Sequence, residues 1–381
     1  MTKHTTSQIL GVLGGGQLGR MLIQSAINYN QDIHILDPDP NAPCKDIAQQ
    51  FQVGSLKDFE TVYAFGQNCD VITVEIEAVN TDALQKLADE GKKVFPQPHI
   101  LKLIQDKREQ KQFYAEHGIP TAEFVLTADK ADVIAKKDFL PAVNKLGREG
   151  YDGRGVQILR SEADLEQAFD APGLLEKLID FDKEIAVTVA RNEKGELIAY
   201  PAVECAFHPT ANLVEFLFAP AEISLEIEAK AQEIAKDVIQ KLDMVGILAV
   251  ELFVTKTGEV LVNEIAPRPH NSGHHTIEAN FTSQFEQHLR SVMNWPLGNP
   301  DLRSPAAMIN LLGEDGYSGE AVVEGKEEAM AEKGVYIHLY GKKLTKPFRK
   351  MGHVTILDEN VESLKARAHR IKELIKIKSN A

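Results

Sequence analysis

The chain has 381 residues, of which 43% are hydrophobic, so it is long enough for two or three domains and can bury a sizeable core. Its formal net charge of -14 at pH 7 disfavours non-specific binding to nucleic acid, although a local basic pocket can still hold a phosphate. The polar start and the short first apolar run predict neither a signal peptide nor a membrane span, and three widely spaced cysteines indicate a reducing, cytoplasmic location.

The N-terminal region is expected to form an open parallel α/β sheet, with strands at 9–13, 33–36 and 71–74 and a helix at 17–29. The glycines of the first strand-to-helix turn satisfy the pattern GxGxxG, which lets a phosphate approach backbone N–H groups. Asp37 ends the second strand, where a dinucleotide fold keeps its ribose-binding acid. The turn predicts either NAD binding or only close packing of the helix on the sheet.

The next region combines a helix with a glycine-rich hairpin. One amphipathic helix is expected over 101–117, with Lys107 in its first half. Strands at 141–145 and 156–159 flank a loop that contains four glycines, and Lys145 ends the first of these strands. Such a loop can fold its amides over phosphates while the lysine supplies a fixed positive charge. The alternative is a flexible hairpin with an exposed lysine; the spacing is not that of a Walker P-loop.

An apolar strand at 173–179 carries the charged pair Glu176 and Lys177. Buried charges need partners, so the strand is a candidate to face a flat base with part of its backbone, while Glu184 accepts ribose hydroxyls. The alternative is an ordinary edge strand whose charges are solvated.

Two apolar strands at 247–253 and 260–265 are separated by a short connection and predict a β-hairpin. A loop of about four residues places Glu251 opposite Glu264 on one face. Two such carboxylates repel unless a cation lies between them, and Mg²⁺ prefers carboxylate and phosphate oxygens. The alternative is that one glutamate faces solvent and the two never meet.

The second strand of this hairpin runs directly into the polar segment 263–274, which contains Arg268, His270 and His274. A rigid arginine fork beside histidine and amide groups predicts a site that grips a carboxylate or phosphate. The alternatives are a solvated polar loop and a zinc site formed with His275, although the spacing matches no helical metal pair. Further on, strands at 335–340 and 353–357 and an amphipathic helix at 361–377 are expected.

In order and spacing, Lys145 with its glycine loop, the segment 176–179, Glu184, Glu251 and the pair at 263–264 resemble the ATP-grasp superfamily. Within it, the segments 14–20, 150–155, 263–274 and 349–353 are similar to the N5-carboxyaminoimidazole ribonucleotide synthetase family, and the resemblance runs from about residue 9 to 357. It implies a mixed α/β and α+β chain with the ATP-grasp fold. The implied parts are a Rossmann-like parallel-sheet domain at 1–100, a central lid domain at 101–187 and an α+β domain at 188–381 that ends in a small subdomain.

The resemblance also implies an activity, which is ATP-dependent carboxylation of 5-aminoimidazole ribonucleotide by bicarbonate through carboxyphosphate. The implied cofactors are ATP and Mg²⁺, with bicarbonate as co-substrate and no NAD. The implied partners are small molecules and a second copy of the chain in a homodimer, with the product passed to a mutase and with neither nucleic acid nor membrane involved.

By the same resemblance, Glu251 and Glu264 hold the metal, and three sets of residues serve the substrates. Nucleotide-binding positions are Lys107, Lys145, Gly150, Tyr151, Gly153, Arg154, Gly155, Glu176, Lys177, Leu178, Ile179, Glu184, His208, Asn263 and Glu264. Catalytic positions are Asp152, which orients or deprotonates the amine, and Arg268, His270 and Asn271, which bind bicarbonate or carboxyphosphate. Ribotide-binding positions are Gln17, Leu18, Glu75, Tyr151, Asp152, Arg154, Ser272, Lys342, Arg349 and Lys350.

The chain departs from the family pattern near its glycine loop. Arg154 stands where lysine is usual, Glu149 where a glycine is usual, and Lys107 where arginine is common. None of these changes removes a charge that the chemistry needs, but they leave the contacts of the loop open.

Other classes of function remain as alternatives. An NAD(P)-dependent oxidoreductase leaves Lys145, Glu251 and Glu264 unexplained, and a catalytically silent nucleotide-binding regulator is expected to lack one of them. A related ligase or formyl-transferring enzyme on another purine ribotide is disfavoured by the segments 268–274 and 349–353.

Overall fold

The computed structural model describes residues 8–148, 150, 155–207 and 214–380. Five predicted site residues lie outside this range, namely Tyr151, Asp152, Gly153, Arg154 and His208. Among the residues described, no helix has the length and apolar character needed to cross a membrane.

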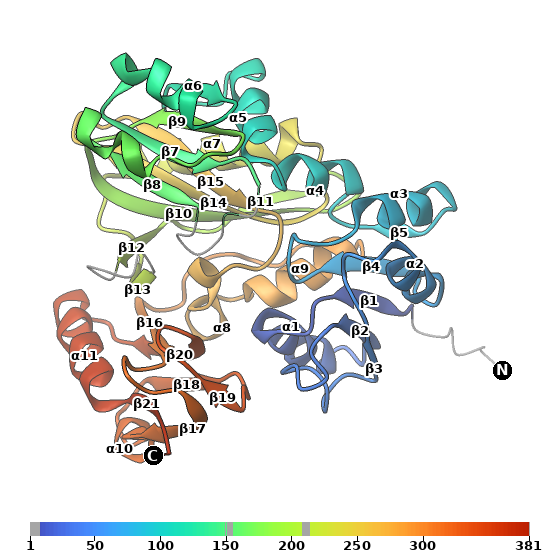
Figure 1. Ribbon diagram of the computed structural model, residues 1–381. Helices are drawn as coiled ribbons and strands as arrows, with labels where there is room; N and C mark the ends of the chain where they lie inside the picture. The colour runs from blue at the N-terminus through green and yellow to red at the C-terminus, as the bar shows by residue number, and fades with distance from the viewer. Residues whose placement is uncertain (1–7, 149, 151–154, 208–213, 381) are drawn as a thin grey trace.

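The N-terminal domain is a parallel sheet with the order β3-β2-β1-β4-β5, as expected for an open α/β sheet (Figure 1). Its strands β1 and β4 are buried along their whole length because helices cover the sheet. Helix α1 ends at Ile27, two residues before the predicted end, because Asn30 adopts a left-handed backbone with φ 50°. The elements are β1 (Leu10–Leu13), α1 (Gln17–Ile27), β2 (Ile33–Asp37), β3 (Gln50–Val53), α2 (Phe59–Gln67), β4 (Val71–Val74), α3 (Thr81–Asp89) and β5 (Lys93–Val94).

The single helix predicted over 101–117 is wrong, because the chain forms α4 (Pro98–Ile104) and α5 (Lys107–Glu116) instead. Asp106 separates them: its backbone is extended and its carboxylate accepts a hydrogen bond from the N–H of Arg108, which caps α5. The side chain of Asp106 is only 1% exposed and also binds the guanidinium groups of Arg108 and Arg148. Lys107 is therefore the first residue of α5.

The lid is an antiparallel sheet with the order β6-β9-β7-β8. The predicted pairing of β7 with β8 around the glycine loop is confirmed. The edge-strand alternative for residues 173–179 is wrong, since β9 lies between β6 and β7. The backbone of Glu176 therefore has strand neighbours on both sides. The expectation that part of this segment faces a base stays a prediction for Leu178 and Ile179, which follow β9. The elements are β6 (Phe124–Thr127), α6 (Lys130–Ala135), β7 (Ala142–Leu146), β8 (Val156–Leu159) and β9 (Gly173–Lys177).

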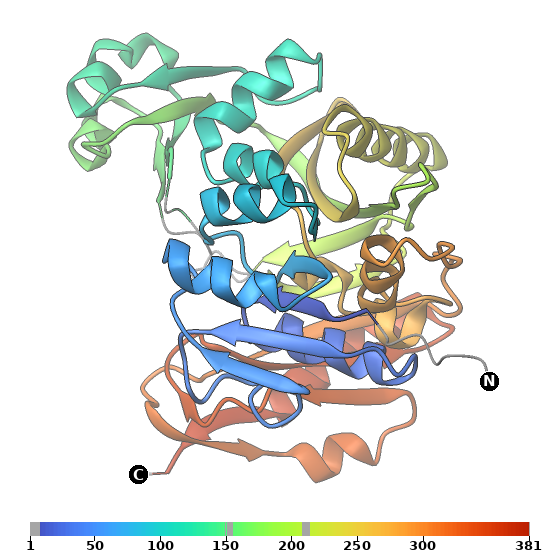
Figure 2. The ribbon, with the colours of Figure 1, turned by 90° about the vertical axis from the view of Figure 1, so that its right-hand side faces the viewer.

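The largest sheet follows the order β15-β14-β10-β12-β13-β16-β20-β18, and β11 adds to β10. In Figure 2 the lid lies at the top of the molecule, and the C-terminal strands, in orange and red, lie at the bottom. The domain boundary predicted at 187–188 is wrong, because it falls inside β10, which pairs with β14 from Phe181 to Arg191. The boundary between the lid and the large sheet lies between β9 and β10. The elements are β10 (Phe181–Arg191), β11 (Leu197–Ala199), β12 (Val203–Phe207), β13 (Val214–Ala219), α7 (Leu225–Lys241), β14 (Gly246–Thr255), β15 (Val260–Ala266), α8 (Thr276–Ala279), α9 (Gln284–Val292), β16 (Ala306–Leu312), β18 (Val335–Leu339) and β20 (Lys350–Leu357).

The C-terminal helix α11 covers residues Val361–Leu374 and not 361–377 as predicted. The last residues form β21 (Lys376–Ser379), which pairs with β17 (Gly319–Glu324). The chain therefore leaves the helix to complete a small sheet that also contains β19 (Leu344–Thr345), while α10 covers Lys326–Met330.

Helix α9 joins the N-terminal sheet to the large sheet. Phe285 and Leu289 of α9 lie in the same apolar core as Leu10 and Ile33 of the N-terminal sheet. The imidazole Nε2 of His288 lies 2.9 Å from Thr73 Oγ1 on β4. These contacts place the polar segment that precedes α9 beside the N-terminal domain.

Buried neutral histidines make the fold sensitive to acid. Burial lowers the pKa of His288 to about 3 and that of His275 to about 4, both from 6.5. Between these values and 6.5 the unfolded chain binds more protons, so the free energy of unfolding falls by roughly 1.4 kcal/mol per histidine for each pH unit below about 6. Urea unfolding at pH 7, 6 and 5 is expected to show this slope, and His288→Gln is expected to reduce it by one histidine. An unchanged slope in that variant would contradict the assignment.

Candidate active site

The two carboxylates of the β14–β15 hairpin face each other, as the sequence predicts. Glu251 pairs directly with Glu264 in the strand register, and a bulge follows between Glu251 and Leu252. Burial raises the pKa of Glu251 to about 8, with further contributions from the charges of Glu184 and Glu264. Burial also favours protonation of Glu264, but its ion pair with Lys107 lowers the pKa of that carboxyl. The alternative that one glutamate faces away from the other is therefore wrong.

A divalent cation fits this pair. Glu251 has no lysine or arginine ion pair in the described part of the chain, and burial, together with the charges of Glu184 and Glu264, raises its pKa. A cation beside Glu251 would stabilise its ionised form. Across the described ranges, no three His, Cys, Asp or Glu side chains are placed to hold a metal, so the three histidines of the zinc alternative form no such site. Two carboxylates suit Mg²⁺, which commonly takes one or two from the protein and its remaining oxygens from phosphates and water.

A buried chain of opposite charges holds Lys145 beside the carboxylate pair. Lys145 Nζ lies 2.7 Å from Glu176 Oε2, and Lys111 Nζ lies 3.1 Å from Glu176 Oε1. Burial opposes the positive charge on Lys145, but the carboxylate of Glu176 raises the pKa of Lys145 above its usual value. For Lys111 burial is the stronger effect, and it lowers the pKa to about 8. Lys111 was not among the residues predicted for the site. The available signal was its position four residues after Lys107, on the same face of a helix.

Asn263 links this chain of charges to Glu184. Its side-chain oxygen accepts a hydrogen bond from Lys145 Nζ at 3.2 Å, and its amide donates to Glu184 Oε1 at 3.4 Å. Burial raises the pKa of Glu184 to about 7. Lys145, Glu184 and the Glu264 carboxylate therefore border one polar centre, as the predicted nucleotide site requires.

Other predicted nucleotide-binding residues lie around the lid. Gly150 and Gly155 meet at the base of the glycine loop, where a Cβ on Gly155 would lie 3.1 Å from the Cα of Gly150. Gly155 also has φ 76°, which favours glycine. Lys177 ends β9 and donates to the carbonyl of Phe139, and Leu178 and Ile179 follow outside any strand. Their contacts with a nucleotide stay predictions.

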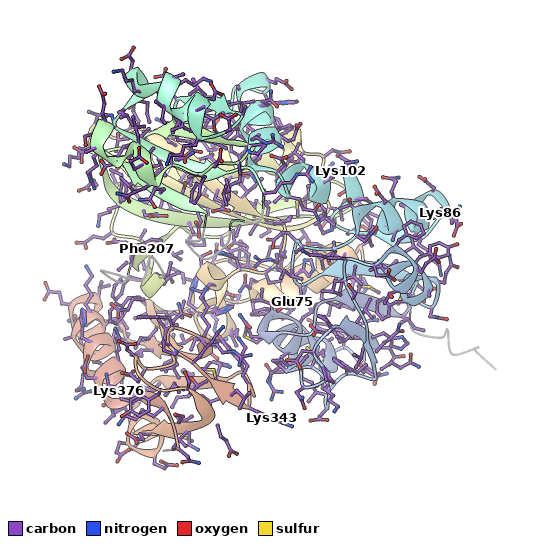
Figure 3. The ribbon with its side chains drawn as sticks, in the orientation of Figure 1. Glu75, Lys86, Lys102, Phe207, Lys343 and Lys376 are labelled. Carbon is purple, nitrogen blue, oxygen red and sulfur yellow. The ribbon has the colours of Figure 1, made fainter. Side chains whose placement is uncertain are left out.

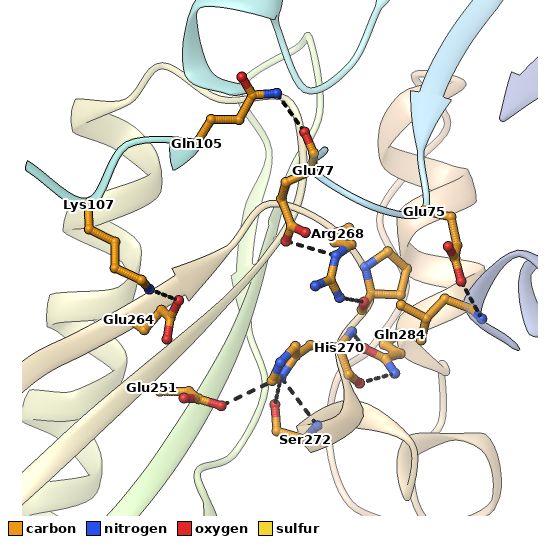
Figure 4. A network of polar contacts seen from close by, with 12 residues as sticks. Glu75, Glu77, Gln105, Lys107, Glu251, Glu264, Arg268, His270, Ser272 and Gln284 are labelled. Carbon is orange, nitrogen blue, oxygen red and sulfur yellow. Dashed lines mark hydrogen bonds and ion pairs between the residues drawn. The ribbon is translucent and has the colours of Figure 1, made fainter. Parts of the chain in front are cut away.

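The anion loop, which we define as residues 268–272, lies directly beside the carboxylate pair (Figure 4). His270 Nδ1 lies 3.8 Å from Glu251 Oε1 and 3.0 Å from Ser272 Oγ. Burial, together with the charges of Arg268 and Lys350, lowers the pKa of His270 well below its usual value, so the imidazole is neutral. Both polar side-chain atoms of Asn271 are buried without a hydrogen-bond partner among the described residues. An unpaired buried amide at this position points to a ligand.

Arg268 is held by the N-terminal domain. Its Nε lies 2.8 Å from Glu77 Oε1, and the side-chain amide of Gln105 donates to the carbonyl of Glu77 at 2.7 Å. Figure 4 shows this series of contacts running from Gln105, which follows α4, through Glu77 to Arg268 in the anion loop. These roles of Glu77 and Gln105 could not be predicted from the sequence, because the contacts join segments that are far apart in the chain.

The glycine turn after β1 is filled by carboxylates. The N–H of Gly15 donates to Asp37 Oδ2 at 2.6 Å, and that of Leu18 donates to Glu75 Oε1 at 3.2 Å. A Cβ on Gly16 would lie 2.5 Å from Glu75 Oε1, so the turn needs glycine for this approach. Because Asp37 binds the turn itself, the dinucleotide alternative loses the acid that it requires for the ribose.

The substrate residues predicted at this turn lie at an interdomain position. Gln17 and Leu18 begin α1 next to Glu75, and Figure 3 shows Glu75 between the N-terminal domain and the segment that carries the anion loop. Burial raises the pKa of Glu75 to about 7, and the charges of Arg268 and Lys342 oppose this shift. Glu75 therefore lies close enough to Arg268 and Lys342, which are far from it in the sequence, for their charges to act on its carboxyl group.

The predicted basic cluster also reaches this centre. Lys342 donates to the carbonyl of Lys350 at 2.7 Å. The charge of Lys350 opposes the rise in the pKa of Glu251 and adds to the fall in the pKa of His270. Arg349 donates to the carbonyl of Leu344 at 2.7 Å. The charge of Lys350 affects the buried carboxyl group of Glu251, which is not expected if the basic cluster were only a solvated surface loop.

Three family models match successive parts of the chain. They are the ribonucleotide synthetase preATP-grasp domain over residues 7–105, the ATP-grasp domain over residues 112–285 and the phosphoribosylaminoimidazole carboxylase C-terminal domain over residues 306–367. Together with the lid, the carboxylate pair and the buried lysines, these matches define the protein as an ATP-grasp enzyme.

Relatives and solved structures narrow the class to one family. The N5-carboxyaminoimidazole ribonucleotide synthase of Synechococcus elongatus is 39% identical over 92% of this chain and 89% of its own. The N5-carboxyaminoimidazole ribonucleotide synthetase of Thermotoga maritima matches with a TM-score of 0.91 and 43% identity, over 98% of this chain and 100% of that chain. The chain belongs to the N5-carboxyaminoimidazole ribonucleotide synthetase family and is an ATP-dependent ligase.

Two further comparisons bear on its length and ligands. The synthase of Aspergillus clavatus, solved in complex with ADP and 5-aminoimidazole ribonucleotide, is 34% identical with a TM-score of 0.88, over 97% of this chain and 98% of that chain. The chain is 40% identical to the chloroplastic phosphoribosylaminoimidazole carboxylase of Vigna aconitifolia over 94% of its own length and spans 65% of the length of that relative.

Proposed function

We propose that this protein carboxylates the exocyclic amine of 5-aminoimidazole ribonucleotide, consuming ATP and bicarbonate and releasing ADP and phosphate. The observation that carries the proposal is the anion loop beside the facing pair Glu251 and Glu264, with His270 Nδ1 3.8 Å from Glu251. A site suited to a small anion therefore lies next to a site suited to a metal ion and the phosphates that it binds. Among the relatives, the Aspergillus clavatus structure holds ADP together with the same ribotide.

The nucleotide is expected to lie between the lid and the large sheet. Lys145 and Lys107 bind its phosphates, and Glu184 accepts hydrogen bonds from the ribose hydroxyls. The ion pair between Glu176 and Lys145 keeps the ammonium group pointed at Asn263 and the carboxylate pair. Glu251 and Glu264 would hold Mg²⁺, which supplies positive charge to the β- and γ-phosphates.

The first chemical step activates bicarbonate. An oxygen of bicarbonate attacks the γ-phosphorus of ATP, the bond to the bridging oxygen breaks, and carboxyphosphate and ADP result. Arg268 and Asn271 hold the bicarbonate with preorganised donors, while the neutral His270 adds a donor or acceptor without a competing charge. Glu77 Oε1 lies 2.8 Å from Arg268 Nε and holds the guanidinium group in place. The Arg268 side chain therefore needs little reorganisation when negative charge develops on the bound anion.

The second step transfers the carboxyl group to the amine. The amine nitrogen forms a bond to the carbon of carboxyphosphate, the carbon–oxygen bond to phosphate breaks, and the amine loses a proton. Asp152 is the predicted acceptor of that proton but lies outside the described residues. Exclusion of water protects the labile intermediate, which is the role predicted for the glycine loop.

The ribotide is expected to lie where the N-terminal domain meets the basic cluster. Gln17, Leu18 and Glu75 would contact its ribose, Ser272 would support the anion loop, and Lys342, Arg349 and Lys350 would bind its phosphate. A homodimer, delivery of the product to a mutase and a cytoplasmic location stay predictions.

The test is ADP release measured with Mg²⁺ and ATP while the ribotide and bicarbonate are omitted in turn. We expect release to require the ribotide, and label from bicarbonate to enter an acid-labile product in equal amount to ADP. Release that another purine ribotide stimulates better would support the related-ligase alternative. ATP binding without any stimulation by ribotides would support a silent regulator.

A further inference from the structure

Gln284 is a buried polar residue with no role in the chemistry described above. It is the first residue of α9, its side chain is 0% exposed, and it lies under the anion loop (Figure 4). A glutamine with no access to solvent needs partners for its amide oxygen and both of its N–H groups. These partners show what the residue does.

The amide of Gln284 binds both backbone groups of His270. The N–H of His270 donates to Gln284 Oε1 at 2.9 Å, and Gln284 Nε2 donates to the carbonyl of His270 at 2.7 Å. A backbone N–H only donates and a carbonyl only accepts, so these two bonds also fix which way the amide points. The second N–H of the amide reaches His274 Nδ1 at 3.1 Å.

The loop is shaped to admit this amide. A Cβ on Gly273 would lie 2.3 Å from Gln284 Oε1, so only glycine leaves room for the contact. The backbone N–H of Gln284 donates to Thr276 Oγ1 at 2.8 Å, and Thr276 donates in turn to the carbonyl of Gly273 at 2.5 Å. Both the side chain and the backbone N–H of Gln284 therefore connect the start of α9 to the loop: the side chain binds His270 directly, and the N–H reaches Gly273 through Thr276.

We propose that Gln284 is the positioning residue of the anion site, which clamps the backbone of His270 so that the imidazole and the neighbouring Arg268 and Asn271 converge on one small anion. This inference rests on the proposed function, because it assigns that anion as bicarbonate. Neither the nucleotide nor the ribotide contacts predicted above involve Gln284. Ser272 is the one predicted ribotide-binding residue within the anion loop, so loss of the clamp is expected to act on bicarbonate more strongly than on ATP or the ribotide.

The test compares Gln284→Met with Gln287→Met. Gln287 is also 0% exposed and lies on the same helix, but its Oε1 accepts from the N–H of Gly298, away from the anion loop. We expect Gln284→Met to lower kcat/KM for bicarbonate by about 10- to 100-fold, because displacement of about 1 Å has this effect. The KM values for ATP and ribotide are expected to stay within about twofold. Gln287→Met is expected to lose thermal stability without a selective change for bicarbonate.

A second variant is expected to break the clamp while both of its members, Gln284 and His270, keep their side chains. Gly273→Ala pushes the amide of Gln284 away from the loop and is expected to give the same selective loss. If the KM values for ATP or the ribotide rise as much as kcat/KM for bicarbonate falls, or if kcat/KM for bicarbonate is unchanged in both variants, the positioning role is overturned.

A measurement without substrate separates this inference from the proposed function. Hydrogen exchange of the peptide that contains His270 is expected to be faster in Gln284→Met than in the wild type or in Gln287→Met. Unchanged exchange would overturn the clamp, whatever the substrate. A wild type that shows no ribotide-dependent ADP release would instead reject the proposed function, while the exchange result still decides whether Gln284 holds the loop.

Discussion

Replacing Glu251 with glutamine is expected to lower the rate of ADP formation by about 1,000-fold, because the pair would lose the carboxylate that has no cation of its own. Glu264 keeps its ion pair with Lys107 in this variant, so the fold around the hairpin is expected to persist. The expected signature is a weaker affinity for Mg²⁺ with nucleotide, measured by calorimetry, together with the loss of turnover.

The matched control is Glu259→Gln, which removes a carboxylate from the exposed turn of the same hairpin. It is expected to leave turnover and metal affinity unchanged. If Glu251→Gln retained wild-type turnover at limiting Mg²⁺, the facing carboxylates would not be the metal site. Equal losses in both variants would indicate a general defect of the hairpin.

Arg268→Lys is expected to lower kcat/KM for bicarbonate by about 100-fold although the positive charge remains. Lysine lacks the planar fork that binds an anion and Glu77 at the same time. With one ammonium group, the side chain is expected to pair with Glu77 and to leave the anion without its donor. Steady-state rates at varied bicarbonate, with ATP and ribotide saturating, measure the effect.

Arg290→Lys controls for the loss of an arginine ion pair. Arg290 pairs with Glu286 on α9, at 2.6 Å, and its guanidinium also donates to the carbonyl of Pro296 and to the hydroxyl of Tyr29. It is expected to leave bicarbonate kinetics unchanged. A wild-type kcat/KM for bicarbonate in Arg268→Lys would show that charge alone is needed, and the geometric role of the fork would then be rejected.

The sequence predicted local structure well wherever apolar alternation and turn length determine it. The hairpin that carries Glu251 and Glu264 follows from two apolar strands and a short turn, and the observed register puts the two residues directly opposite. The parallel N-terminal sheet follows equally from apolar runs between helices. The break at Asp106 escaped prediction, because the residue stops the helix through its buried partners Arg108 and Arg148 and not through periodicity.

For the site, the chemical groups and their order along the chain could be predicted from the sequence: the lysine before the glycine loop, the facing carboxylates and the polar segment after β15. These are local patterns, set by residue type and by the alternation of strands. Three features could be seen only in the folded chain: β9 is a central strand of the lid, Glu77 holds Arg268, and Gln284 clamps His270. Each of these depends on a contact between segments far apart in the chain, and a polar side chain shows its partner only once burial has removed water as the alternative.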